Sequence, residues 1–183
     1  MTRRWALRGL TWLPPWWHSG WGKTEVPDET LEQLVKGVGQ VCISASSLEW
    51  ALTYLVGLIE NWDDAKHRQV LRTGGRSLEE FCSLASRLEA FGLGAEVTVL
   101  ADDARRLLRS RHRIVHSVMM IETKAGDEDR YEAWHAMSDT VWPLVPKDLY
   151  DLAFELADCT ADVMGLAAAW QERAEHDGWP VVP

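Results

Sequence analysis

The stretch LVKGVGQVCISASSLEWALTYLVGLI, residues 34 to 59, decides the fold class. Its apolar side chains recur every three or four positions, the spacing that places them along one side of an α-helix. Asp28 is a suitable N-cap for this helix, and the pattern continues to about Asn61. Gly37 and Gly39 lower the helix propensity near its first third and are candidate positions for a kink. The sequence therefore predicts one long helix around which the domain is built.

The rest of the chain continues this helical pattern, with short breaks at polar and glycine-rich segments. Ser77 and Glu80 have the spacing of a capping box at the start of a further helix. Lys124 to Asp127 is turn-like and lies between two short segments that suit a β-hairpin. The predicted elements after the first helix are a turn or short helix within residues 63–75, a helix over 77–91, a helix from about 95 through the segment that ends near 120, a hairpin of 118–123 and 130–137, and a last helix from 146 or 147.

The length of 183 residues suits a single domain with extensions at both ends. Residues 1–26 form a tryptophan-rich arm, residues 27–175 a helical bundle and residues 176–183 a C-terminal tail. The arm contains Trp5, Trp12, Trp16, Trp17 and Trp21. Its indoles could pack onto the bundle or a second subunit, or they could dock on a membrane surface or partner, since tryptophan suits half-hydrated interfaces. The fold class predicted is all-α: a four- or five-helix up-down bundle with one small β-hairpin.

Composition and charge exclude several classes of protein. A net charge of −9 argues against a protein that coats nucleic acid through its general field, so any polyanion must be met locally. The three cysteines show no C-x-x-C spacing and suit a reducing compartment. Arg8 and Pro14-Pro15 interrupt the apolar start of the chain, and no later stretch reads as a membrane span. We expect a cytoplasmic protein without a transmembrane segment.

The helix that begins near residue 95 carries the residues of chemical interest. On a helical wheel, Arg111 falls at the centre of an apolar arc formed by Leu100, Ala104, Leu107, Ile114, Val115 and Val118. A guanidinium stays charged, and burying it without partners costs several kcal/mol, so Arg111 should be paired or should face a cleft or a subunit interface. His112 and His116 lie one turn apart beside this arc.

The string R-H-R-I-V-H, Arg111 to His116, resembles the signature of HEPN domains. That signature is an arginine, a polar residue directly after it, and a histidine four to six residues beyond. The match covers six residues closely, and its place in a helical bundle spanning roughly residues 28 to 175 also fits the family. The resemblance implies a bundle of HEPN type and a metal-independent endoribonuclease that acts as a homodimer, with the motifs of both subunits meeting in one composite cleft.

The resemblance also implies roles for the three side chains, and no cofactor. His116 would be the general acid or base, Arg111 the phosphate clamp, and His112 the neighbour that positions the RNA substrate or shares proton transfer. The chain departs from the toxins of paired nucleotidyltransferase and HEPN modules, which carry a tyrosine two residues after the histidine, where this chain has Val118. Regulation through modification of such a tyrosine is therefore not expected.

Other residues supplement this site. Glu49 falls on the apolar arc of the first long helix, and we expect its carboxylate to lie close to Arg111 and orient it. Arg105, Arg109 and Arg113 supply a local basic patch that would bind RNA weakly and with strong salt dependence. Two histidines one turn apart also suit a metal ion, but the nearby guanidinia oppose a dication, so no metal site is predicted. The remaining histidines, His18, His67, His135 and His176, are expected to be surface or lightly packed residues.

Three functions compete on this sequence. The first is an RNA-cleaving HEPN dimer, a toxin or phage-defence effector with an antitoxin or defence-system partner protein. The second is a non-catalytic HEPN-like module that dimerises and binds a nucleotide or a protein. The third is a membrane-peripheral bundle anchored through the tryptophan-rich arm.

Overall fold

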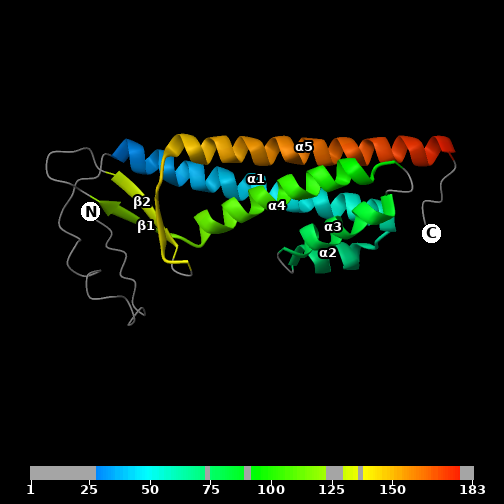
Figure 1. Ribbon diagram of the computed structural model, residues 1–183, viewed down its shortest axis with the longest axis horizontal. Coiled ribbons are helices and arrows are strands. Elements are labelled where there is room, and N and C mark those ends of the chain that lie inside the picture. Colours follow the sequence, from blue (N-terminus) through cyan, green and yellow to red (C-terminus); the bar gives the residue numbers. More distant parts are fainter. Residues whose placement is uncertain (1–27, 73–74, 89–91, 123–129, 136–137, 178–183) are drawn as a thin grey trace.

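The computed structural model describes residues 28–72, 75–88, 92–122, 130–135 and 138–177 (Figure 1). The arm, residues 1–26, and most of the predicted tail lie outside these residues. The predicted helical class is confirmed, although the described part forms three strands where a two-stranded hairpin was predicted. In chain order the elements are α1 (Asp28–Glu60), α2 (Asp64–Arg72), α3 (Arg76–Leu88), α4 (Gly94–Val115), β1 (Val118–Glu122), β2 (Arg130–His135), β3 (Thr140–Pro143) and α5 (Pro146–Asp177).

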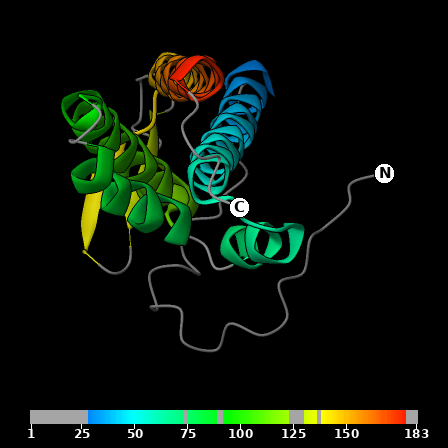
Figure 2. The same cartoon turned by 90° about the vertical axis from the view of Figure 1, so that its right-hand side faces the viewer.

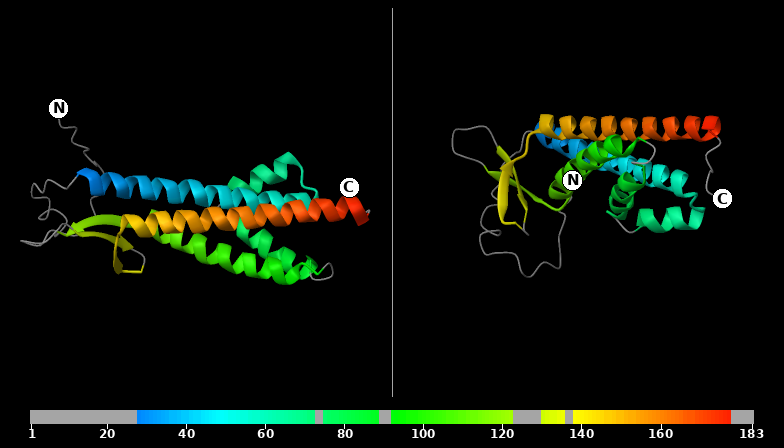
Figure 3. Two further views of the ribbon diagram at one scale, coloured as in Figure 1. Left: turned by 90° about the horizontal axis from the view of Figure 1, so that it is seen from above. Right: turned by 45° about the vertical axis from the view of Figure 1, so that its right-hand side comes forward.

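The three long helices, α1, α4 and α5, alternate in direction along the chain. Helices α1 and α5 both begin at the end of the molecule that holds the sheet, and α4 runs back toward that end (Figures 1 and 3). A Cβ built at Gly37 would lie 2.9 Å from the Cβ of Leu149, so this glycine lets α1 and α5 approach closely. Gly37 and Gly39 do not interrupt the helix, because α1 is continuous from Asp28 to Glu60.

The short helices α2 and α3 fold back beside the end of α1. Asn61 ends α1 in the left-handed region with φ of 51°, and the Trp62 N–H donates to the Gly57 carbonyl at 2.9 Å, as in a Schellman motif. Ser77 does not serve as the predicted helix cap, because α3 already begins at Arg76. Its buried hydroxyl instead accepts a hydrogen bond of 2.7 Å from Thr53 of α1.

The sheet follows α4 directly and has the antiparallel order β1-β2-β3. Helix α4 ends at Val115 and does not continue to residue 120 as predicted, because Val118 already pairs with Trp134 of β2. Within β2, Tyr131, Ala133 and His135 are buried and the residues between them are half-buried. Since side chains alternate along a strand, β2 turns this buried face toward the rest of the protein.

The core lies between α1, α3, α4 and α5, whose rods surround it in the end-on view of Figure 2. Its largest fully buried side chains include Phe81 and many leucines of these helices. Helix α1 is also long and apolar enough to cross a membrane, with a hydropathy of 1.4, which the sequence reading did not expect. Half of this apolar segment of α1 is buried inside the protein. The core helix of a soluble bundle has the same length and composition, so these features are weak evidence for a membrane span.

Candidate functional site

Arg111 lies where the helical wheel predicts, on the face of α4 that carries the buried side chains of Val97, Ala104 and Leu107. The residue is half-buried, and its Nε is buried without a hydrogen-bond partner. No ion pair to Arg111 is formed by the residues that the structure describes. A buried, unsatisfied donor on a charged group costs free energy unless an acceptor arrives. Arg111 is therefore suited to bind an anion.

His112 and His116 form a close pair at the end of α4. Their ring centroids are 4.3 Å apart, with an angle of 47° between the ring planes, and both side chains are exposed. His116 is the residue that closes the helix, and its backbone N–H donates to the His112 carbonyl at 3.0 Å. Spacing of four residues along an α-helix produces this contact. The structure thus presents two solvent-accessible imidazoles beside Arg111.

A third imidazole, which the sequence reading placed at the surface, joins this pair from β2. His135 is only 8% exposed, and its ring lies 6.3 Å from that of His112 in an edge-to-face arrangement. Its Nδ1 is 2.9 Å from the Ser138 hydroxyl, which is 2.7 Å from the hydroxyl of Thr140. Its Nε2 is buried without a partner. The alternation of buried residues along β2 is the signal that could have identified His135.

Arg113 extends the site toward β3. Its guanidinium lies over the ring of Trp142, 4.8 Å from the ring centroid, while the side chain remains exposed. A guanidinium stacked on an indole is attracted by the ring and keeps its outer face free. Trp142 is directly opposite Ala133 in the sheet register, so the sheet holds this pair near the end of α4. Arg113 is the predicted RNA-binding arginine that the structure places best for that role.

The electrostatic surroundings lower the pKa of His112 below its ordinary value. The largest cause is partial desolvation of the ring, followed by the nearby His116, His135 and Arg111. Each of these groups is a cation or can become one, so a proton on His112 is disfavoured. At neutral pH the ring is therefore neutral and able to accept a proton.

The predicted ion pair between Glu49 and Arg111 is not formed among the described residues. Glu49 is half-buried on α1, about 30 Å along the helix axis from the end that lies near the sheet. Arg111 is only about 6 Å along α4 from its sheet-side end. The two residues share the core side of their helices, but no hydrogen bond or ion pair joins them.

The other predicted RNA-binding arginines differ in their availability. Arg105 pairs with Asp102 and donates to the Cys82 Sγ at 3.1 Å, which turns it toward α3. Arg106 pairs with Glu155 at 2.8 Å. Arg109 is exposed, and the described part of the chain offers it no ion pair. Carboxylates thus neutralise the arginines farther from the histidines, and the cationic character concentrates near Arg111 and Arg113.

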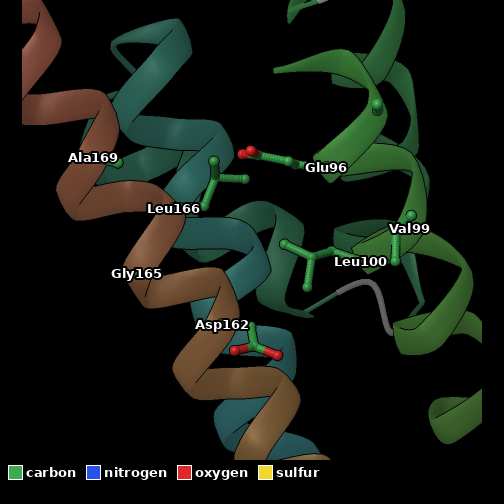
Figure 4. Close-up of a pocket in the computed structure, with 8 residues that line it drawn as sticks. Glu96, Val99, Leu100, Asp162, Gly165, Leu166 and Ala169 are labelled. Carbon is green, nitrogen blue, oxygen red and sulfur yellow. The ribbon is translucent and has the colours of Figure 1, made fainter. Parts of the chain in front are cut away.

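Two open grooves lie elsewhere on the protein. One, of about 530 Å³, runs between α4 and α5 and is shown in Figure 4. It is mostly apolar, and its charged residues are Glu96 and Asp162, which would repel a phosphate. The other groove lies between α1 and α5, beside Trp50 and Thr160. Neither groove is lined by His112, His116 or His135.

No group of three or more metal-ligating side chains is arranged to hold an ion within the described ranges. This includes the three histidines at the end of α4 and in β2. Comparison of the chain with family models, with curated proteins and with solved structures gives no match.

Proposed function

We propose that this protein is an endoribonuclease of HEPN type that cleaves RNA without a metal ion at the end of α4. The observation that carries the proposal is the half-buried Arg111, with an unpartnered Nε, beside the exposed imidazole pair of His112 and His116. An arginine that lacks an internal acceptor suits a phosphate. Two imidazoles in contact suit the two proton transfers of phosphodiester cleavage.

The reaction uses one neutral and one protonated imidazole. Two rings 4.3 Å apart resist carrying two protons, and the lowered pKa of His112 makes it the neutral partner. His112 takes the proton of the ribose 2′-hydroxyl as that oxygen attacks the adjacent phosphorus. The bond from phosphorus to the 5′-oxygen breaks, and His116 gives this oxygen a proton. Arg111 stabilises the charge that develops on the non-bridging oxygens. The products are a 2′,3′-cyclic phosphate and a free 5′-hydroxyl.

A homodimer would complete this site. Within one copy the histidines lie on an open surface, whereas catalysis benefits from a site that excludes water and surrounds the reacting phosphate. A second copy that places its own α4 end opposite the first would supply a second Arg111 and a second histidine pair. In this proposal the protein is cytoplasmic and acts as a toxin or defence effector, restrained by a partner protein.

One observation favours a second candidate, a non-catalytic module that binds a nucleotide or a protein. The net charge of −9 and the pairing of Arg105 and Arg106 with carboxylates leave few cations to hold an RNA strand. A mononucleotide needs fewer contacts, and Arg111 with Arg113 would suffice for it.

Cleavage of a fluorescent single-stranded RNA in the presence of a chelator separates the two candidates. We expect the wild-type protein to cleave, and we expect Arg111→Ala and His116→Ala to lower the rate by about 100-fold or more. Arg106→Ala is the matched control, because it removes an arginine of the same helix whose charge is already paired with Glu155. Absence of cleavage by the wild type, or equal losses in Arg106→Ala, would reject the nuclease.

A further inference from the structure

The part of the site contributed by the sheet contains a buried group that the reaction above does not use. His135 is more than nine-tenths buried, yet its Nε2 has no hydrogen-bond partner. It lies beside His112, edge-to-face with that ring, and it is one of the groups that, with Arg111, lower the pKa of His112. His135 Nε2 and Arg111 Nε are thus two buried nitrogens without a hydrogen-bond partner, and both residues lie near His112. A buried donor without a partner is destabilising, and an acceptor that reached it would recover that loss.

The hydroxyl groups of the β2–β3 connection determine what His135 can donate. Thr140 and Ser138 are 2.7 Å apart at their hydroxyl oxygens, and the Ser138 hydroxyl is 2.9 Å from His135 Nδ1. When Thr140 donates to Ser138 and Ser138 donates to Nδ1, the neutral ring carries its proton on Nε2. The chain of hydroxyls then aims an N–H donor away from the turn.

We propose that His135 contacts the bound phosphate, donating from Nε2 to the group that Arg111 holds, and that Ser138 and Thr140 are positioning residues that select the Nε2–H tautomer. The inference rests on the proposed function in one respect, namely that the phosphate belongs to an RNA strand. It adds a donor from the sheet to a site otherwise built from one helix. It also gives a reason for a polar side chain to be buried at the end of β2.

The test is NMR of the full-length protein with ¹⁵N-labelled histidine rings, titrated separately with inorganic phosphate and with a 2′-O-methyl RNA tetranucleotide. The methylated strand binds without being cleaved, because its 2′-oxygen carries no proton to lose. We expect the free protein to show the Nε2–H tautomer at His135. Both ligands should shift the His135 Nε2 signal, and Ser138→Ala and Thr140→Val should reduce the population of that tautomer.

Two substitutions of His135 distinguish the role of its Nε2–H as a hydrogen-bond donor from the role of its ring in packing. Gln places an amide nitrogen near the position of Nε2, whereas Asn places one near Nδ1. We expect His135→Gln to keep phosphate affinity within a few fold and His135→Asn to lose about 10- to 100-fold, the effect of one hydrogen bond to a charged group. Ser47→Ala is the control for Ser138→Ala, since the exposed Ser47 hydroxyl only donates to the Ile43 carbonyl within α1.

The outcomes are distinct from those of the cleavage assay. If the affinity for either ligand depends on His135, the inference is supported even when no RNA is cleaved. Whichever ligand binds shows whether the site takes the phosphate of an RNA strand or a free phosphate ion. Equal affinities of His135→Gln and His135→Asn would overturn it. So would an Nδ1–H tautomer, unshifted His135 signals, or failure of both ligands to bind.

Discussion

Two imidazoles, one in α2 and one in the sheet, each have a buried ring nitrogen without a hydrogen-bond partner, but their surroundings differ. His67 of α2 and His135 of β2 each have a buried Nε2 without a hydrogen-bond partner, and each lies edge-on to another ring, Trp62 or His112. The residues around His67 already interact with one another. The ammonium of Lys66 lies over the Trp62 ring at 5.1 Å, and the Trp62 indole donates to Glu60 at 2.7 Å.

The residues of α4 near His135 are not paired with acceptors in this way. His112 and His116 are exposed, His116 helps to lower the pKa of His112, and Arg111 has its own unpartnered nitrogen. An orphan ring nitrogen alone therefore does not indicate a binding site, because His67 has one in a corner that only joins two helices. What distinguishes the sheet end is that two unpartnered nitrogens, on Arg111 and His135, lie near an exposed pair of imidazoles.

Gly57→Ala tests the structural role of the His67 corner and should give the largest effect on stability. The His67 ring lies against Gly57, and an added Cβ would overlap it. We expect the free energy of unfolding, measured by urea denaturation, to fall by about 1–3 kcal/mol. RNA cleavage per folded molecule should be unchanged, because the corner lies away from the end of α4.

Gly39→Ala is the matched control on the same helix, since a Cβ there meets no atom within 4 Å. It should stabilise α1 by up to about 1 kcal/mol through helix propensity. The double variant with His67→Ala should recover part of the Gly57→Ala loss, because the overlapping ring is gone. Additive losses in the double variant would contradict the packing argument.

The histidine cluster should make stability depend on pH. The folded-state pKa of His112 is lowered, so the unfolded chain binds its proton first as the pH falls through about 6.5. Above this pH, His112 therefore does not change the free energy of unfolding. Below it, the free energy of unfolding decreases until the pH has fallen past the folded-state pKa of His112. Urea denaturation of wild type and His112→Gln between about pH 8 and 5 should show the wild type losing stability relative to the variant. A stability difference between the two proteins that stays constant over this range, or a wild type that gains stability relative to the variant as the pH falls, would contradict this expectation.

Arg113 should give the smallest effect, visible in the salt dependence of RNA binding. Removing one phosphate contact to a single strand lowers the slope of log K against log salt by about 0.7. We expect this change in Arg113→Ala, measured by fluorescence anisotropy with the 2′-O-methyl strand. Arg113→Lys should keep the slope but bind more weakly, because lysine lacks the planar group that stacks on Trp142. An unchanged slope in Arg113→Ala would remove Arg113 from the site.

The sequence by itself determined the features that depend on local spacing. The periodicity of residues 34 to 59 predicted α1 within a residue or two of its observed limits, Asp28 and Glu60. The same rule placed Arg111 on the buried side of α4 and brought His112 and His116 together, because residues four apart on a helix are neighbours. Resemblance of this segment to HEPN domains is a statement about six residues, and the function built on it remains a proposal.

The tertiary structure decided which residues from other elements meet that helix. It brought His135 to His112 through the strand pairing that follows α4, and it placed Arg113 over Trp142 of β3. It also left Glu49 and Arg111 without an ion pair, although both lie on the core sides of their helices. The physical reason is that periodicity specifies the direction of a side chain around its helix axis. Which side chains of other elements it meets depends on how the helices and strands pack, and a local sequence pattern does not specify that packing.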